Sequence, residues 1–186
     1  MRIIGGKYKG RRIAMPQEIR PTKDNVREAI FNVISVHVKG ARVLDLFAGS
    51  GAFGIEALSR EASSVVLIDN SKSCIDTISK NIDNLDDTEA QERARILKRD
   101  VHVGIKALSG AKEKFDIVFL DPPYYKNRIR KCLKNISIYD ILAHSGLVIV
   151  EHFKKDVVPE EIEPLMLKRQ LPYGDTLISI YKSSKF

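Results

Sequence analysis

Residues 115–124 read F-D-I-V-F-L-D-P-P-Y, which joins a strand pattern to an abrupt stop. The apolar run that opens the stretch is typical of a strand covered on both faces of a sheet. Pro122 and Pro123 cannot donate a ladder hydrogen bond, so we expect the strand to end at Asp121. A carboxylate, a carbonyl without a competing N–H and the ring of Tyr124 are therefore presented together where a strand ends.

This combination suits a flat base that carries an exocyclic amine. Asp121 and the carbonyl of Pro122 can accept the two amine hydrogens, and the ring of Tyr124 can stack on the base. An ordinary Pro-Pro turn with a surface acid is the alternative interpretation. The candidate catalytic residues are Asp121, Pro122 and Tyr124.

Further strand patterns occur on both sides of this stretch and alternate with helical patterns. They lie at residues 42–47, 65–68, 94–97, 146–150, 164–169 and 176–181. The alternation predicts an α/β fold with a doubly wound, mostly parallel, seven-stranded Rossmann-like sheet, and the last two strands are expected to form a C-terminal antiparallel hairpin. The acidic stretch at residues 86–93 is expected to be a loop.

The N-terminal residues form a separate pattern, which predicts a small β-hairpin and helix extension. The glycines of G-G-K-Y-K-G suggest a hairpin turn, and Thr22 is the expected N-cap of a helix from Lys23 to Val36. Arg27 falls off the apolar face of that helix. We therefore expect an extension at residues 1–40 and a main domain at residues 41–186.

The composition excludes several classes of protein. The chain has 186 residues, a hydrophobic content of 44% and a net charge of +7, which is typical of one globular domain. Neither a bilayer-spanning run nor a signal peptide is evident, and the two cysteines and four histidines form no metal-ligand pattern. We expect a cytoplasmic monomer with no membrane association and no metal.

The positive charge is concentrated near the N-terminus. Residues 1–42 hold ten Lys and Arg against three acids, an excess equal to the whole net charge of +7. This favours a polyanionic partner, most simply nucleic acid, over an ordinary solvated basic face. The candidate RNA-binding residues are Arg2, Lys7, Tyr8, Lys9, Arg11, Arg12 and Arg20, with a second group at Lys126, Arg128 and Arg130.

The loop after the first predicted strand, G-S-G-A-F-G at residues 49–54, matches G-x-G-x-x-G. A dinucleotide is one candidate ligand. However, Asp45 precedes the glycines, and its charge suits a cationic ligand such as S-adenosylmethionine better than a pyrophosphate. Asp69 can then accept from ribose hydroxyls, and Asp100 can face the adenine amine. The candidate cofactor-binding residues are Asp45, Phe47, Gly49, Ser50, Gly51, Asp69, Asn70, Asp100 and Val101.

These motifs together resemble a known family. D-L-F-A-G-S-G-A-F-G-I-E-A-L-S-R at residues 45–60, with D-P-P-Y at 121–124, resembles the class I S-adenosylmethionine-dependent methyltransferases that modify amines. The chain more narrowly resembles the bacterial RsmD family. The blocks that carry this closer resemblance are R-I-I-G-G-K-Y-K-G-R-R at 2–12, R-P-T-K-D-N-V-R-E-A-I-F-N at 20–32, V-I-V-E at 148–151 and Y-G-D-T-L-I-S-I-Y at 173–181.

The resemblance implies an enzyme that transfers a methyl group to the 2-amino group of a guanine in 16S rRNA. Its expected partner is an assembled or nearly assembled small ribosomal subunit. An amino-methyltransferase acting on adenine or cytosine in DNA is the first alternative, because D-P-P-Y serves those enzymes too. An NAD-dependent oxidoreductase is the second, and Asp45 argues against it.

Overall fold

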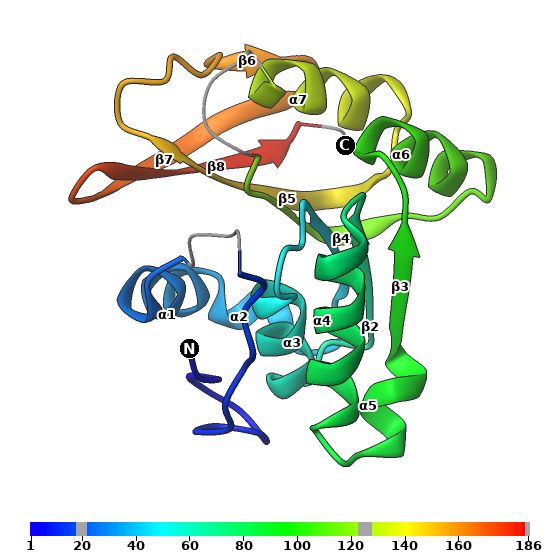
Figure 1. Ribbon diagram of the computed structural model, residues 1–186. Helices are drawn as coiled ribbons and strands as arrows, with labels where there is room; N and C mark the ends of the chain where they lie inside the picture. Colours follow the sequence, from blue (N-terminus) through cyan, green and yellow to red (C-terminus); the bar gives the residue numbers. More distant parts are fainter. Residues whose placement is uncertain (18–21, 123–127, 185–186) are drawn as a thin grey trace.

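The computed structural model describes residues 1–17, 22–122 and 128–184 (Figure 1). Within these residues eight strands form one sheet in the order β3-β2-β1-β4-β5-β8-β7-β6. The strands are β1 (Arg42–Leu46), β2 (Ser64–Asp69), β3 (Ala94–Lys98), β4 (Phe115–Leu120), β5 (Leu142–Phe153), β6 (Glu161–Ile162), β7 (Leu165–Tyr173) and β8 (Thr176–Ser183).

The sheet has a parallel half and an antiparallel half. Strands β1 to β5 pair in parallel, whereas β8 is antiparallel to β5 and β7 is antiparallel to β8. The predicted α/β fold with its C-terminal antiparallel hairpin is therefore confirmed. The predicted count of seven strands was wrong, because the two-residue strand β6 pairs with β7 at the edge of the sheet.

Helices cover both faces of this sheet, as Figure 1 shows. The described helices are α1 (Asp24–Val33), α2 (Ser35–Val38), α3 (Ala52–Ser59), α4 (Lys72–Asp83), α5 (Thr88–Arg93), α6 (Val101–Gly110) and α7 (Arg128–Ile138). Residues of α1 to α5 share one apolar core with one face of the sheet, while α6 and α7 share a second core with the other face. No helix of the described residues is both long and apolar enough to cross a membrane.

The strand order places a ligand-binding crevice at one edge. Strand β1 lies between β2 and β4, so the chain winds away from β1 in opposite directions. In such doubly wound sheets the loops at the carboxyl ends of the strands separate at this switch point and leave room for a ligand. The carboxyl edge of β1, β2, β4 and β5 is therefore where a functional site is expected.

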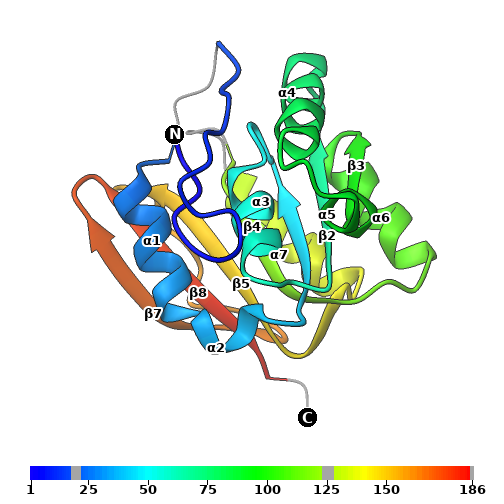
Figure 2. The ribbon, with the colours of Figure 1, turned by 90° about the horizontal axis from the view of Figure 1, so that it is seen from below.

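The N-terminal hairpin lies against α1 and α3 (Figure 2). Its two arms are joined by a bridge between Arg2 and Arg12 and by a hydrogen bond from Ile3 N to Arg11 O of 2.9 Å. Ile3 and Tyr8 are buried in the same apolar core as α1 and α3. The predicted boundary near residue 40 stays a prediction, and the structure packs the hairpin directly on the main sheet domain.

The start of α1 differs from the sequence prediction. Thr22 was expected to cap a helix from Lys23 to Val36, but α1 begins at Asp24 with Lys23 as its N-cap and ends at Val33. The hydroxyl of Thr22 instead donates a 2.8 Å hydrogen bond to Oε2 of Glu151. This tertiary contact takes the side chain away from the N–H groups of the helix.

Arg27 falls off the predicted apolar face of the helix and is nevertheless buried: its side chain is 0% exposed, and its Nε lies 3.7 Å from Oε2 of Glu56. A further expectation about this half of the chain was wrong. The stretch at residues 86–93 is not wholly a loop, because it contains α5. Asp87 starts that helix by accepting hydrogen bonds from the N–H groups of Glu89 and Ala90.

Candidate active site

A cavity of about 700 Å³ lies at the carboxyl edge of the sheet. Segments that follow β1, β2, β3 and β4 contribute to its wall, together with the last residues of β5, Glu151 and Phe153. Residues near Met15 and Thr22 and the turn between β7 and β8 complete it. This volume is within the range typical of small-molecule sites. Of the predicted cofactor-binding residues, those that line the cavity are Phe47, Gly49, Ser50, Asp69, Asn70, Asp100 and Val101.

The glycine loop is built by left-handed backbone angles. Gly49 and Gly51 have φ values of 56° and 77°, which glycine adopts without steric cost, and Gly51 is the N-cap of α3. Phe47 has a φ of 60°, an uncommon conformation for a residue with a bulky side chain. A Cβ atom on Gly54 would lie 2.7 Å from Leu67 Cδ2, so the third glycine allows α3 to pack closely on β2.

Asp69 and Asn81 hold this loop in place. Oδ2 of Asp69 accepts from Gly49 N at 3.0 Å, and Oδ1 accepts from Ser71 N at 2.9 Å. The side-chain amide of Asn81 donates to Ser50 O at 2.9 Å and also to the carbonyl of Ala14. Asn81 was not predicted, since a buried amide on a helix face has no local sequence signal, yet it joins the N-terminal segment to the glycine loop.

Asp100 lies at the rim of the cavity as the exposed N-cap of α6. Its carboxylate accepts from His102 N at 2.9 Å. Val101 is buried directly beside it. Asn70 is exposed at the end of β2 and also lines the cavity.

Asp45 occupies a different place from the one that the sequence suggested. It is 2% exposed, is not among the described residues that line the cavity, and accepts a 3.0 Å hydrogen bond from Gly54 N with its Oδ2. Burial raises the pKa of Asp45 to about 8, and the negative charge of Asp69 adds to the shift. Asp45 thus anchors the start of α3 rather than facing a ligand directly.

We expect Asp45→Asn to change the pH dependence of stability. The pKa of Asp45 is higher in the folded than in the unfolded chain, so its contribution to stability is present below about pH 4 and is lost as the pH rises toward 8. Asparagine keeps an acceptor for Gly54 N and carries no charge. At pH 8 the variant should unfold with a free energy higher by roughly 1–3 kcal/mol, as measured by urea denaturation.

The gain from Asp45→Asn should shrink as the pH is lowered and disappear near pH 4. Asp83→Asn is a suitable control, because Asp83 is exposed on α4. A gain that stays constant between pH 4 and pH 8 would contradict the buried, protonated state assigned to Asp45.

Two acids lie side by side at the carboxyl end of β4 and near that of β5. Leu120 of β4 is paired with Val150 of β5, so the next residues, Asp121 and Glu151, lie side by side on neighbouring parallel strands. Both line the cavity, together with Pro122 and Thr22. Glu151 was not predicted as a site residue, although its position after the apolar run of β5 follows the strand-end pattern of the other acids.

Burial perturbs the pKa values of both carboxyl groups, and repulsion by neighbouring carboxylates also perturbs that of Asp121. Burial raises the pKa of Asp121 well above its ordinary value, and the charges of Glu151 and Asp45 raise it further. Burial also raises the pKa of Glu151. The hydroxyl of Thr22 opposes both shifts and favours the ionised forms. Perturbed carboxyl groups in a cavity are typical of functional sites.

The predicted RNA-binding residues fall into several groups. Arg2, Lys9 and Arg12 are exposed on the N-terminal hairpin. Lys7 and Arg11 are also exposed, but they contact the segment between α4 and α5. Lys7 Nζ lies 2.5 Å from Asp87 Oδ2, and Arg11 donates to the carbonyl oxygens of Asn84 and Leu85.

Tyr8 differs from the rest of the predicted RNA-binding set. Its ring is 2% exposed and its hydroxyl donates to Asp87. In this conformation it is not available to stack on a base, because the ring packs in the apolar core.

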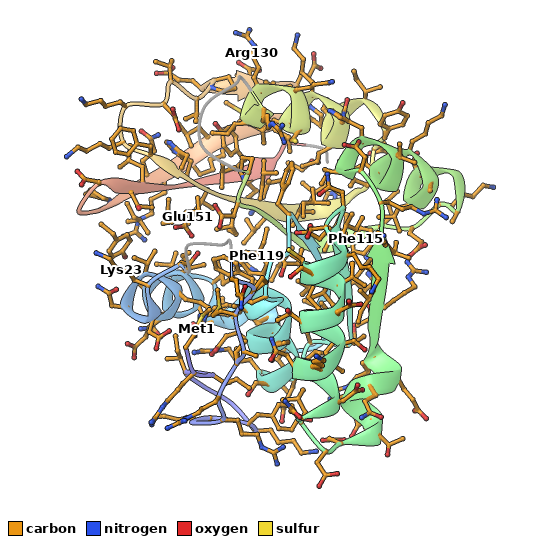
Figure 3. The ribbon with its side chains drawn as sticks, viewed as in Figure 1. Met1, Lys23, Phe115, Phe119, Arg130 and Glu151 are labelled. Carbon is orange, nitrogen blue, oxygen red and sulfur yellow. The ribbon has the colours of Figure 1, made fainter. Side chains whose placement is uncertain are left out.

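The second basic group lies on another part of the surface. Arg128 lines the cavity and Arg130 is exposed on α7. Figure 3 shows Arg130 and Met1 on opposite sides of Glu151. Three predicted site residues, Arg20, Tyr124 and Lys126, lie outside the described residues.

No metal site is evident in the described ranges 1–17, 22–122 and 128–184. They contain no group of three or more His, Cys, Asp and Glu side chains placed to hold an ion.

Comparison with known proteins identifies the family. The family model described as "Conserved hypothetical protein 95" matches residues 1–182. The chain is 36% identical to YlbH of Bacillus subtilis, which is named as a proposed rRNA methyltransferase, over 98% of both chains. It is 32% identical to ribosomal RNA small subunit methyltransferase D of Escherichia coli, over 98% of this chain and 89% of that protein.

The fold comparison agrees with the sequence comparison. A solved Escherichia coli structure described as a proposed methyltransferase, yhhF, superposes with a TM-score of 0.87 at 32% identity, over 98% of this chain and 97% of that one. The chain therefore belongs to the methyltransferase family described as conserved hypothetical protein 95, which is the RsmD family that its sequence motifs resemble.

Proposed function

We propose that this chain transfers a methyl group from S-adenosylmethionine to the exocyclic 2-amino group of a guanine in small-subunit (16S) rRNA. The observation that carries the proposal is the placement of Asp121 and Pro122 in the same cavity as the glycine loop and Asp69. The group proposed to recognise an amine and the group proposed to bind a nucleoside thus line one cavity. The names of the two relatives, both rRNA methyltransferases, support rRNA as the substrate class.

The described residues fit S-adenosylmethionine. The backbone of the glycine loop would let the methionine part approach closely, and the carboxylate of Asp69, at the end of β2, is proposed to accept from ribose hydroxyls. Asp100 lies at the rim, within the same wall, where it can accept from the adenine amine. The chemistry that this cofactor supplies when bound is a methyl group on a positively charged sulfur.

The chain's own residues orient the acceptor amine. Asp121 and the carbonyl of Pro122 accept its two hydrogens, which aims the nitrogen lone pair and stabilises positive charge that develops on nitrogen. The carboxylate of Asp121 is proposed to take the proton that the nitrogen loses when it gains the methyl group. Tyr124, outside the described residues, is proposed to stack on the base. The exposed cations of the N-terminal hairpin and of α7 are proposed to hold RNA phosphates, which are the sequence-independent part of such interfaces.

We further propose that a monomer acts on an assembled or nearly assembled small subunit. The exposed cations that the described residues show on the hairpin and α7 suit phosphate contacts, which do not read a long RNA sequence by themselves. A folded particle would supply the rest of the recognition by its shape.

The test is a methyl-transfer assay with labelled S-adenosylmethionine. Small subunits from a strain that lacks the enzyme, their naked rRNA and duplex DNA are incubated in parallel, with Asp121→Ala as the control. Label on a single rRNA guanine, mapped by nuclease digestion and mass spectrometry and absent with the variant, is the expected result. Label on DNA alone would overturn the substrate and retain the cofactor.

A further inference from the structure

Two carboxylates, not one, face the place where the target base is expected. The register of β4 and β5 sets Asp121 beside Glu151, because Leu120 is paired with Val150 immediately before them. The preceding alternate residues of both strands, Phe119 and Ile149, belong to the apolar core under α1 and α3. Asp121 and Glu151 therefore project from the same face of the sheet, and Figure 3 shows Glu151 between that sheet and α1.

Glu151 is held in a fixed position for this role. It is 7% exposed, and its Oε2 accepts the hydrogen bond of 2.8 Å from Thr22, while the residue also lines the cavity. Among the described residues, no carboxylate oxygen that is fully buried lacks a hydrogen-bond partner. Burial raises the pKa of Glu151, and the hydrogen bond from Thr22 opposes that shift; in its ionised form the carboxylate only accepts hydrogen bonds.

The bases that carry exocyclic amines differ in the atom beside the amine. Guanine has two adjacent donors on its Watson–Crick edge, the ring N1–H and the 2-amino group. Adenine and cytosine have a ring nitrogen that accepts, N1 or N3, next to their amines. One carboxylate can bind the amine of any of the three, whereas a second carboxylate beside the first can pair only with a second donor.

We infer that Glu151 determines specificity for guanine by accepting a hydrogen bond from N1–H while Asp121 accepts from the 2-amino group. The inference deepens the proposed function and rests on it. When Glu151 is ionised, a ring nitrogen that accepts would instead face a desolvated carboxylate oxygen without an intervening proton, and such a mismatch rejects the wrong base. The same contact draws no proton from the base, so the methyl-transfer step itself is unchanged.

The experiment compares guanine with 2,6-diaminopurine at the methylated position of reconstituted small subunits. The analogue keeps the 2-amino group but has an accepting N1. We expect the wild-type enzyme to methylate the 2-amino group of guanine with a kcat/KM about 10- to 100-fold higher than that of the analogue, as measured by nucleoside mass spectrometry. Because this arm uses the unaltered protein, it does not depend on the folding of a variant.

The second arm uses Glu151→Gln, whose amide can turn its NH₂ toward an accepting N1. The variant should lose kcat/KM on guanine and gain it on the analogue, so that the preference falls to near unity or reverses. Glu161→Gln, an exposed change on β6, should keep the wild-type preference. Cofactor binding and thermal unfolding are measured on each variant to confirm that the folded site is retained.

The outcomes separate the two proposals. Methylation of guanine with the same preference in wild type and Glu151→Gln would overturn the role of Glu151 and leave the proposed function standing. Equal methylation of guanine and the analogue by the wild type would also overturn it. Absence of methylation of guanine in subunits by the wild type would overturn the proposed function and this inference with it.

Discussion

Replacing Asp121 by alanine should lower kcat for methyl transfer by about 10³-fold or more, because the variant loses both the acceptor that orients the amine and the negative charge that stabilises positive charge on nitrogen. Asp121→Asn keeps a carbonyl acceptor but not the charge, so its kcat should lie between those of Asp121→Ala and the wild type. The measurement is single-turnover transfer of labelled methyl to small subunits, in which chemistry is separated from product release.

The loss should not arise from unfolding or from loss of the cofactor. Burial raises the pKa of Asp121 well above its ordinary value, so the folded chain bears a cost for ionising this group that alanine removes. We therefore expect Asp121→Ala to unfold at the same or a higher denaturant concentration at pH 8. Its affinity for S-adenosylmethionine, measured by calorimetry, should change by less than about threefold; retained activity with intact binding would contradict the catalytic role.

The pH dependence of transfer follows from the same pair of acids. In the proposed mechanism methyl transfer requires an ionised carboxylate beside the amine, and the pKa values of Asp121 and Glu151 are both raised. Activity should therefore fall as the pH drops through a range above the ordinary titration of Asp and Glu. Thr22→Val removes the hydrogen bond that lowers both pKa values, so the fall in activity at low pH should begin at a higher pH. Thr22→Ser keeps a hydroxyl and should leave the pH dependence of activity unchanged.

The sequence predicted the parts of the site that depend on strand ends. Asp69, Asp100 and Asp121 were recognised because parallel strands end at one edge of a sheet, and all three line the cavity. Glu151 obeys the same rule but was missed. Strand β5 continues past it to Phe153, so no turn residue marks the position.

The remaining errors concern contacts between segments that are distant in the chain. Spacing alone placed Asp45 near a ligand, but it cannot tell that Gly54 N already uses the carboxylate. Thr22 and Tyr8 looked like a helix cap and an exposed ring, and both instead bond to acids more than 70 residues away, Glu151 and Asp87. Local propensity does not contain such partners, so the structure was needed to assign them.

The largest effect on stability is expected from Glu56→Ala. Glu56 lies on α3 with a 0% exposed side chain, and its two oxygens accept from Ile4 N, Gly5 N and Arg60 Nε at 2.8 Å each. The buried guanidinium of Arg27 lies 3.7 Å away and its Nε makes no hydrogen bond of its own within the described residues. Alanine would leave these donors without their acceptor and would remove one of the two carboxylates near the buried guanidinium, so that Asp24, 3.2 Å from the Arg27 side chain, would be its remaining ion-pair partner.

We expect this variant to lose about 3–5 kcal/mol of unfolding free energy, the range for breaking a buried ion pair from one side. Urea denaturation monitored by circular dichroism measures the loss. Glu61→Ala is the matched control, because Glu61 pairs with Lys39 at 2.6 Å on the surface, with both side chains mostly exposed. That change should have little measurable effect.

The Glu56→Ala change should also disturb the cavity. Glu56 fixes the N-terminal hairpin on α3, and Met1 and Met15 of the same N-terminal segment line the cavity wall. We expect Glu56→Ala to weaken cofactor binding even at temperatures where the main sheet stays folded. Adding Arg27→Met removes the buried charge that loses its Glu56 partner in Glu56→Ala. The double variant should therefore have a higher unfolding free energy than the sum of the two single losses predicts. Strict additivity of the two losses would mean that Glu56 acts through its backbone donors alone, and that the buried charge of Arg27 is satisfied by the carbonyl of Arg2.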